Sequence, residues 1–383
     1  MSMTDAAPAA ASALVPVVVI GAGGMGRAWI GTVLRSDAAR LVGVADVLEG
    51  AAERAVAEVV PEEQRAAIVT GTDALDVARR SGAEAVIDVT IPAAHHAVTA
   101  DALHAGYPVL WEKPCAATLA EAVSLAGHAE ATGKLFMVSQ SRRNNPHLHE
   151  ARRLADELGG AGIVDTRFYK APRFGGFRDE MEHPLIVDMA IHAFDAGRVL
   201  IDGNPLDVTA TSYNPSWSWY AGDTAATVTI TYDSGVVHTF AGSWAAPGAE
   251  TSWNGDWRIS GEHGSVLWDG ETAPTSHAAA AEATEARLGR APDPDARWEL
   301  ADSLERFCAA LRGGPVPDSE VHANVWTQAI VEAAVRAADT GVRVQLADLL
   351  EEALAAARIL DSADGRSSAL HSWNTGTSGL SIG

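Results

Sequence analysis

The feature that most constrains this chain is a glycine-rich turn set between a short apolar run and an amphipathic segment. Val15–Ile20 has the pattern of a strand, Gly21-Ala22-Gly23-Gly24-Met25-Gly26 follows it at once, and Gly24–Ser36 has the pattern of a helix. In such a unit Gly21 allows a tight turn, Gly23 lets the backbone approach a pyrophosphate, and Gly26 lets the helix pack closely on the sheet. Unpaired N–H groups at the helix start then face phosphate oxygens. The pattern predicts a dinucleotide site formed by Gly21, Gly23, Gly24, Met25 and Gly26.

An acidic residue stands where the second strand of this unit is expected to end. Arg40–Ala45 has the pattern of that strand, and Asp46 lies twenty residues after Gly26 (46 − 26 = 20). A carboxylate there accepts hydrogen bonds from the adenosine ribose hydroxyls and repels a 2′-phosphate. The next residues, Val47 and Leu48, offer no arginine to receive such a phosphate. We therefore expect the site to bind NAD rather than NADP. The alternative to a dinucleotide site is a glycine-rich turn that binds no ligand.

The order of predicted elements changes along the chain. Up to Ser139 short strands alternate with helices, which predicts a parallel sheet covered on both faces. Farther on, strand patterns follow one another through short turns, which predicts an antiparallel sheet. The fold class is therefore α/β: a doubly wound domain, then an α+β domain with a large, mostly antiparallel open sheet. The predicted limits are 1–140 (1–13 a disordered start), 141–360 for substrate binding and oligomerisation, and 361–383 as a flexible tail.

Charge and composition exclude several kinds of partner. Fifty acidic against 28 basic side chains give a net charge of −22, which repels nucleic acid and anionic lipid. No apolar run approaches the ~20 residues of a membrane-spanning helix, and Val15–Ile20 is too short for a signal-peptide core. The two cysteines, Cys115 and Cys308, fit neither a disulfide framework nor a metal-ligand spacing. We expect a cytoplasmic protein with a small-molecule substrate, no metal, no nucleic acid and no membrane.

Residues that end the fourth and fifth strands are candidates for the cofactor site, because the carboxyl ends of such strands face the ligand. Thr90 and Pro92 are expected beside the nicotinamide, with His96 either there or packed at the helix start. Glu112-Lys113-Pro114 follows the fifth strand. Only three of the 28 basic residues are lysines, which favours a functional role for Lys113 over a salt bridge with Glu112.

A long apolar helix is predicted over Pro184–Ile201, with three polar exceptions. Asp188, His192 and Asp195 are spaced i, i+4 and i+7, so they share one face of an α-helix. A buried polar stripe is either satisfied within the core or lines a cavity. A metal site at these three residues is a weaker alternative, because no further ligand cluster accompanies them.

Arginine and tryptophan provide candidate substrate contacts. Arg143 and Arg173 suit a polyhydroxylated or anionic substrate, and surface roles are the alternative. Six of the 11 tryptophans lie between Trp217 and Trp268. Trp217 and Trp219 point to one side if their segment is extended, as in sugar-binding faces, or else serve as core or subunit contacts.

Taken together, these motifs resemble the Gfo/Idh/MocA family (glucose–fructose oxidoreductase, inositol dehydrogenase, rhizopine catabolism). The matching features are the glycine turn, the Pro92-to-His96 spacing, Glu112-Lys113-Pro114, Arg143 with Pro146, and the Asp188-x-x-x-His192-x-x-Asp195 helix, over roughly Val15 to Leu346. Ala190 stands where the family commonly has glycine, and Trp217–Tyr220 and the tail after Leu360 lie outside the general pattern. The resemblance implies a Rossmann domain, an open-sheet domain that often forms a homo-oligomer (here a dimer or tetramer), and catalytic roles for Lys113, Asp188 and His192.

The resemblance implies oxidation of a secondary alcohol of a sugar, glycoside or cyclitol, with hydride passing to nicotinamide C4. We expect His192 to take the hydroxyl proton because its ordinary pKa is ~6.5. Lys113 would polarise the hydroxyl and Asp188 would orient the substrate or the lysine. Two alternatives stay open: a glycosidase that retains NAD and oxidises its substrate transiently, and a non-catalytic NAD sensor.

Overall fold

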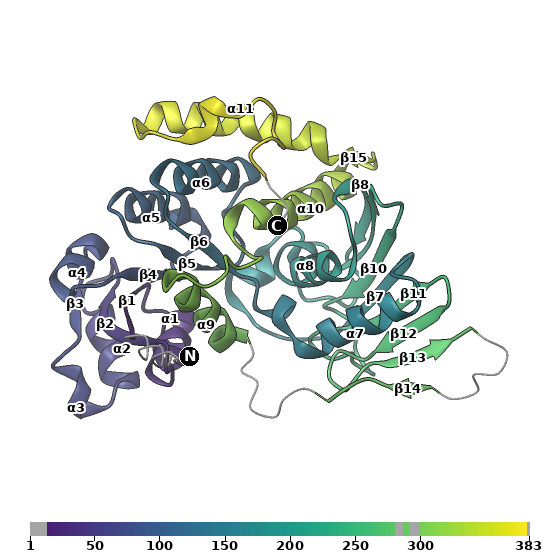
Figure 1. The fold of residues 1–383 in the computed structure, drawn as a ribbon, viewed down its shortest axis with the longest axis horizontal. Coiled ribbons are helices and arrows are strands. Elements are labelled where there is room, and N and C mark those ends of the chain that lie inside the picture. The colour runs from purple at the N-terminus through teal and green to yellow at the C-terminus, as the bar shows by residue number, and fades with distance from the viewer. Residues whose placement is uncertain (1–13, 280–285, 292–298, 381–383) are drawn as a thin grey trace, which may run out of the picture. The chain divides into compact units, whose positions relative to one another are not determined.

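The computed structural model describes residues 14–279, 286–291 and 299–380 of the chain, which form two compact units (Figure 1). The first takes its described residues from 1–112, 132–139 and 300–320, and the second from 113–131, 140–299 and 321–383. The units are therefore not consecutive stretches of chain. The predicted domain limits at residues 140 and 360 stay a prediction.

The first unit contains a six-stranded parallel sheet in the order β3-β2-β1-β4-β5-β6. Its strands are parallel and bring their carboxyl ends to one edge, and the order in which strands are added reverses between β1 and β4, as in dinucleotide-binding sheets. This topology confirms the doubly wound half of the predicted fold. The elements are β1 (Val15–Ile20), α1 (Gly24–Leu34), β2 (Ala39–Ala45), α2 (Ala51–Val59), α3 (Glu62–Arg65), β3 (Val69–Gly71), α4 (Ala74–Ser81), β4 (Ala85–Asp88), α5 (Pro92–His104), β5 (Val109–Glu112), β6 (Phe136–Ser139) and α9 (Glu299–Leu311).

The core of the first unit lies between β1 and helices that are far apart in the sequence. Trp29 and Ile30 of α1 are fully buried against the sheet. The amphipathic helix α9 adds Phe307 and Cys308 to the same core, although the sequence places this helix within the predicted second domain. Helix α9 is held on this core by its buried apolar side chains, since full burial of one Phe side chain contributes roughly 1.5–3 kcal/mol.

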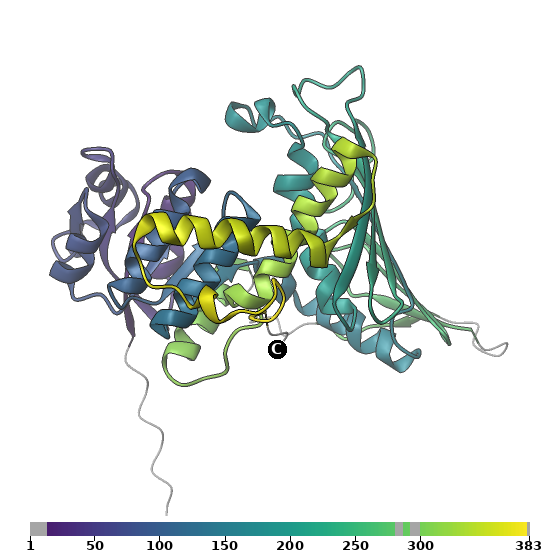
Figure 2. The same ribbon diagram turned by 90° about the horizontal axis from the view of Figure 1, so that it is seen from above.

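The second unit contains a nine-stranded sheet in the order β14-β13-β12-β11-β7-β10-β9-β8-β15. Only β7 and β10 pair in parallel, which confirms the predicted mostly antiparallel sheet. Three helices lie along one face of it, namely α7 (Pro146–Glu157), α8 (Ile191–Leu200) and α10 (Val321–Thr340) (Figures 1 and 2). The strands are β7 (Ile163–Tyr169), β8 (Pro205–Tyr213), β9 (Ala225–Tyr232), β10 (Val237–Ser243), β11 (Asp256–Gly261), β12 (Gly264–Trp268), β13 (Thr275–Ala278), β14 (Arg287–Leu288) and β15 (Val344–Gln345).

The helical segments of the second unit carry most of its polar candidates. The predicted helix over Pro184–Ile201 is present as a π-helical segment, η3, that continues into α8. Short π-helical insertions are rare in proteins overall, and those that occur are often found at functional sites. The segments are α6 (Leu119–Thr132), η1 (Ser141–Asn144), α7 (Pro146–Glu157), η2 (Gly176–Glu180), η3 (Leu185–Ala190), α8 (Ile191–Leu200), α10 (Val321–Thr340), α11 (Leu346–Asp364) and η4 (Ala369–Ser372).

The C-terminal segment differs from the flexible tail that the sequence predicts from residue 361. Helix α11 continues to Asp364, and Trp373 beyond it is buried, with its indole N–H donating to Glu130 at 2.8 Å. Arg358 donates to the backbone oxygens of Leu370 and Trp373. A few buried side chains and hydrogen bonds therefore hold this segment against the second unit, although its Gly/Ser-rich composition is typical of a mobile tail.

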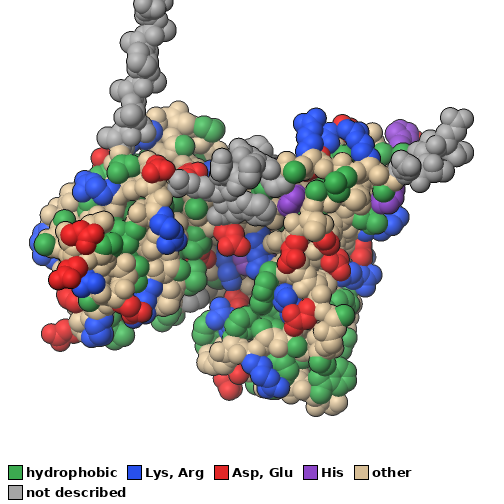
Figure 3. Space-filling view, turned by 90° about the horizontal axis from the view of Figure 1, so that it is seen from below, with side chains coloured by type: hydrophobic (Ala, Val, Ile, Leu, Met, Phe, Trp, Pro, Cys, Tyr) green, Lys and Arg blue, Asp and Glu red, His purple; other side chains and the backbone are tan. Residues whose placement is uncertain are grey.

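Charged side chains are dispersed over the surface in the view of Figure 3, where acidic and basic groups alternate on both units. The acidic surplus does not form one block on this face. Among the described residues, no helix is both long and apolar enough to span a membrane.

Candidate functional site

The glycine turn of the first unit has two different kinds of glycine. Gly21 has a φ of +98°, and a Cβ there would lie 2.8 Å from the backbone oxygen of Val89. A Cβ on Gly26 would lie 1.9 Å from the oxygen of Gly21, so this position permits the close approach of α1. Gly23 and Gly24, in contrast, have open space where a Cβ would stand, at the exposed start of α1. Two glycines therefore shape the turn and two leave room above it.

Asp46 stands at the end of β2, beside this turn. Its two carboxylate oxygens accept from the backbone N–H groups of Ala22 at 2.8 Å and Leu48 at 2.9 Å. A pocket of about 670 Å³ opens here within the first unit. Its lining includes, besides Gly21, Gly23 and Asp46, the residues Val47, Leu48, Leu75, Val89, Thr90, Ile91, Ala94, Val98 and Asp101. The apolar walls suit a flat base, and the carboxylate suits ribose hydroxyls.

The other predicted cofactor residues are placed as follows. Thr90 lines the pocket, and α5 begins at Pro92. Met25 is about half exposed at the start of α1. Glu112 accepts from the Trp29 indole at 3.2 Å, within the first unit. His96 lies on the side of α5 away from the pocket-lining Ala94 and Val98, as the 100° helical step requires.

Two buried titratable groups lie just below the pocket. Asp88, at the end of β4, accepts from the N–H of Thr90 at 3.0 Å, and burial raises its pKa to about 7. His95 donates to the oxygen of Thr90 at 2.7 Å, and burial lowers its pKa to about 3. Thr90 is therefore fixed from both sides, and His95 is a neutral core histidine.

In the second unit, Lys113 and Asp188 form an ion pair. The ammonium nitrogen lies 2.7 Å from Oδ1 of Asp188 and 3.1 Å from its backbone oxygen. Arg178, from η2, donates through Nε to the other carboxylate oxygen at 2.6 Å. The Lys113 and Asp188 side chains are only 16% and 15% exposed. Burial acts to raise the pKa of Asp188, but Lys113 and Arg178 outweigh it and lower the pKa, so the carboxylate is ionised.

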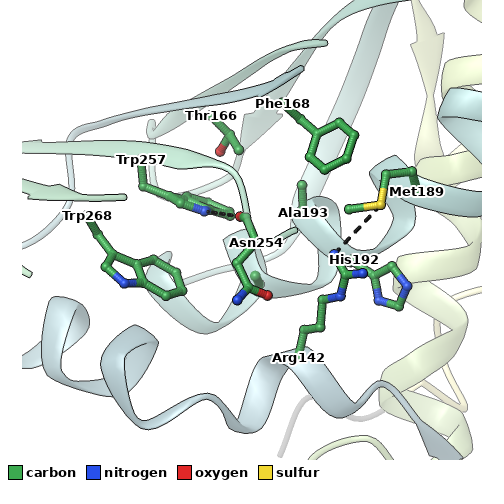
Figure 4. A pocket seen from close by; sticks show the side chains of 10 residues that line it. Arg142, Thr166, Phe168, Met189, His192, Ala193, Asn254, Trp257 and Trp268 are labelled. Atoms are coloured by element: carbon green, nitrogen blue, oxygen red, sulfur yellow. Dashed lines mark hydrogen bonds between the residues drawn. The ribbon is translucent and has the colours of Figure 1, made fainter. Parts of the chain in front are cut away.

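His192 stands on α8 in the same unit, beside Arg142 of η1. Figure 4 shows the guanidinium of Arg142 next to the imidazole and to Met189, with Asn254 and the ring of Trp257 beyond them. Burial, and then the charges of Arg142 and Lys113, hold the pKa of His192 well below its usual value. Its buried Nδ1 has no hydrogen-bond partner among the described residues. His192 is therefore a neutral imidazole with an unused ring nitrogen.

Asp195 and Arg143 do not join this cluster. Asp195 is buried and accepts from Arg143 and from Thr327, each at 2.8 Å. Asp195 stands on α8 with His192, whereas Arg143 stands on η1, and the two form an ion pair in the core of the second unit. Arg143, a predicted substrate residue, is thus placed in a structural ion pair, and Asp195 does not contact Lys113.

The remaining predicted substrate residues lie on a separate aromatic surface. Arg173 stacks on Trp219, with its guanidinium carbon 3.9 Å from the ring centroid. Trp217 is 63% exposed and donates to the backbone oxygen of Ala245 at 2.7 Å. These contacts organise the Trp217–Tyr220 segment, and the exposed ring of Trp217 leaves a face available to a ligand.

Comparison with known proteins identifies both halves of the chain. Residues 15–140 match a family model described as an oxidoreductase family with an NAD-binding Rossmann fold, and residues 150–267 match the Gfo/Idh/MocA C-terminal domain. The chain belongs to the Gfo/Idh/MocA family. It is accordingly an oxidoreductase with NAD as its cofactor, which confirms the resemblance drawn from the motifs.

Named members of the Gfo/Idh/MocA family resemble the chain at moderate identity. It is 31% identical over 199 residues to inositol 2-dehydrogenase 1 of Saccharopolyspora erythraea, covering 51% of this chain and 57% of that protein. It is 26% identical over 341 residues to 1,5-anhydro-D-fructose reductase of Ensifer adhaerens, covering 86% and 97%. An oxidoreductase from Agrobacterium radiobacter, solved with NAD+, L-tartaric acid and magnesium, shares the fold with a TM-score of 0.75 at 18% identity, covering 88% and 100%.

The glycine turn and Asp46 fit the cofactor that this family binds. Gly23 and Gly24 leave open space above N–H groups that no side chain caps, and the Asp46 carboxylate borders the apolar pocket. These residues would hold the pyrophosphate and a ribose of NAD.

Three residues of the second unit were not found from the sequence. Arg142 and Arg178 contact the Asp188–His192 region, and Asn254 lines the hollow beside His192. The sequence does not show which of the adjacent residues Arg142 and Arg143 faces the site. Their side chains point in different directions from a short turn, and only the structure gives those directions. For Arg178, the flanking Phe174 and Phe177 are the one available signal, since both rings stack on its guanidinium.

Proposed function

We propose that this chain oxidises a secondary alcohol of a sugar, glycoside or cyclitol with NAD+, and that Lys113, Asp188 and His192 carry the chemistry. The observation that supports it is the Lys113–Asp188 ion pair with the neutral His192 in the same unit. Lys113 directly follows β5, a strand of the NAD-binding sheet. The relatives named as inositol 2-dehydrogenase and 1,5-anhydro-D-fructose reductase support the substrate class.

The electrostatics favour Lys113 over His192 as the proton acceptor. An ammonium formed at Lys113 is stabilised by the Asp188 carboxylate 2.7 Å away. An imidazolium at His192 would instead be buried beside the cations Arg142 and Lys113. We therefore exchange the roles expected from the unperturbed pKa of histidine. The Lys113 ammonium first releases one proton to solvent, and the resulting amine takes the hydroxyl proton. His192 hydrogen-bonds and orients the same hydroxyl.

Asp188 acts as a positioning residue in this scheme. It fixes Lys113 through Oδ1 and is itself held by Arg178 through Oδ2. When bound, NAD+ supplies the acceptor for the hydride that leaves the carbinol carbon. The transfer restores the Lys113 ammonium, which loses a proton to solvent before the next oxidation, or gives it to the substrate oxygen when the reaction runs as a reduction.

We also propose a cytoplasmic homo-oligomer, a dimer or tetramer. The chain has only two cysteines, and both are buried, as is usual for a protein of a reducing compartment. Exposed Ile163, Leu206, Tyr213 and Leu267 on the strands of the nine-stranded sheet support a subunit contact. Light scattering after gel filtration gives the stoichiometry, and a monomer at micromolar concentration would contradict the proposal.

The test is NADH formation, followed by near-ultraviolet absorbance, across a panel of cyclitols, monosaccharides, sugar acids and glycosides with NAD+ and NADP+ separately. Turnover with NAD+ and one substrate class supports the proposal and names the substrate. Cleavage of a glycoside without net NADH, by protein that retains NAD through purification, would favour the glycosidase alternative. NAD binding without turnover of any kind would favour the sensor.

A further inference from the structure

Among the residues that the structure describes, Arg142 is a cation with no carboxylate hydrogen-bonded to it. Its Nη1 donates to two neutral acceptors, the backbone oxygen of Trp253 and, at 3.7 Å, the sulfur of Met189. Its Nε and Nη2 make no hydrogen bond within the described ranges. An arginine normally satisfies its donors with anions when it leaves water. Arg142 therefore has a two-donor edge available beside the proposed catalytic residues.

Neighbouring arginines show what this position lacks. Arg143 reaches Asp195 at 2.8 Å, and Arg178 reaches Asp188 at 2.6 Å. Burial lowers the pKa of Arg142 to about 10, and the more distant charges of Glu299 and Asp188 only partly offset that effect. Glu299 is exposed and makes no ion pair with it in the described part of the chain. The surroundings of Arg142 are thus short of negative charge.

We propose that Arg142 binds a carboxylate of the substrate, so that the preferred substrate is a sugar acid, a polyhydroxylated carboxylic acid, rather than a neutral sugar or cyclitol. The inference rests on the proposed dehydrogenase function and narrows its substrate class. The Nε and Nη2 edge of a guanidinium presents two parallel N–H groups, which match the two oxygens of one carboxylate. A monoanion is neutralised by this one cation, whereas a dianionic phosphate would keep an uncompensated charge.

The hollow next to Arg142 limits where the substrate lies. It is lined by His192, Phe168, Asn254 and Trp257 and has a volume of about 10 Å³, room for one water molecule. A sugar ring therefore lies outside this hollow. Its carboxylate contacts the free edge of Arg142, and a hydroxyl contacts His192 and Lys113. This gives the substrate two fixed points, which orients the carbon that is oxidised.

The experiment compares matched acid and neutral pairs, D-glucuronate with D-glucose and D-galacturonate with D-galactose, plus D-glucose 6-phosphate. NADH formation gives kcat/KM, and calorimetry with the protein–NADH complex gives the affinity independently of turnover. The wild type is expected to prefer the acid of a pair. Arg142→Gln should lower kcat/KM and affinity for the acid about 10- to 100-fold, the range for a lost hydrogen bond to a charged group, and change the neutral partner less than threefold.

Arg142→Lys keeps the charge without the two-donor edge and is expected to recover only part of the preference. Arg258→Gln, an exposed change on β11, is the matched control and should leave both values unchanged. Thermal melting and NAD+ affinity show whether Arg142→Gln is folded, and if it is not, Arg142→Lys carries the test.

Four outcomes would each overturn the inference: equal use of acid and neutral partners by the wild type, equal losses on both in Arg142→Gln, preference for the phosphate, or no acid binding at millimolar concentration. If no compound is turned over but acids still bind through Arg142, the dehydrogenase proposal fails and the carboxylate site stands.

Discussion

The two units build their sites in opposite ways. In the first, six consecutive residues and one acid at the end of β2 form the proposed nucleotide site, and backbone shape is the main determinant. In the second, side chains from four separate segments, at residues 113, 142, 178 and 188–192, come together: Lys113 and Arg178 pair with the Asp188 carboxylate, and Arg142 contacts Met189. A site made by local backbone geometry can be recognised from a short motif. A site made by converging charges depends on how distant segments pack.

The largest effect that separates the two sites should come from Lys113→Met. Removing the proposed proton acceptor is expected to lower kcat about 1,000-fold, within the range for general acid–base catalysis. NAD+ affinity, which depends on the first unit, should change less than threefold. Steady-state kinetics and NADH-fluorescence titration measure the two quantities, with Lys134→Met as the matched control. A Lys113→Met enzyme that keeps its rate, while His192→Gln loses both the rate and its pH dependence, would return the proton acceptor role to His192.

The next effect concerns stability and is confined to the first unit. Asp88 has a pKa of about 7 in the folded chain against an ordinary 3.8, and its Oδ2 has no hydrogen-bond partner among the described residues. The unfolded chain therefore releases this proton first, so stability is lost as the pH rises from about 4 through 7. Asp88→Asn keeps the acceptor for the Thr90 N–H and is expected to stabilise the protein by up to about 4 kcal/mol at pH 8, and by little at pH 4.

Thermal unfolding of Asp88→Asn at both pH values, with exposed Glu63→Gln as the control, checks this expectation. Equal stability of wild type and Asp88→Asn at pH 8 would mean that the carboxylate is solvated there.

The same contrast explains what could be predicted from the sequence. The alternating pattern of Ala225–Tyr232 predicts a strand, and the apolar periodicity of Leu119–Thr132 predicts a helix. Both elements are found at these limits because pattern and burial agree there. The sequence of Ala66–Val69 has the pattern of a short strand, but the strand lies at Val69–Gly71, since the chain before it forms the short helix α3. In the second site, the spacing of Asp188 and His192 was visible. The separate role of Asp195 was not, because its hydrogen bonds with Arg143 and Thr327 depend on how η1 and α10 pack against α8.

Within the glycine turn, two substitutions of equal size should behave differently. Gly26→Ala places a Cβ against the oxygen of Gly21, at 1.9 Å before any shift, and should destabilise the first unit by about 1–3 kcal/mol or more and abolish NAD+ binding. Gly23→Ala meets no atom within 4 Å and has an ordinary φ of −69°, so stability should not change. It should still weaken NAD+ about tenfold or more by blocking the approach of the pyrophosphate. Thermal melting with and without NAD+ distinguishes the two, and a destabilised Gly23→Ala would show that this glycine also shapes the turn.

The smallest expected effect tests which part of the first site depends on a side chain. Asp46→Ala removes a charged acceptor for ribose hydroxyls and should raise KM for NAD+ about 10- to 100-fold with little change in kcat. It should also improve the relative use of NADP+, because the charge that repels a 2′-phosphate is gone. The carboxylate holds the N–H groups of Ala22 and Leu48 as well, so Asp46→Asn, which keeps one acceptor oxygen, separates the two roles. If Asp46→Asn restores melting temperature but not NAD+ preference, the negative charge selects the cofactor and the hydrogen bonds only support the turn. If Glu49→Ala, an exposed neighbouring acid, changed the preference as much, selection would come from the general field of this acidic chain rather than from Asp46.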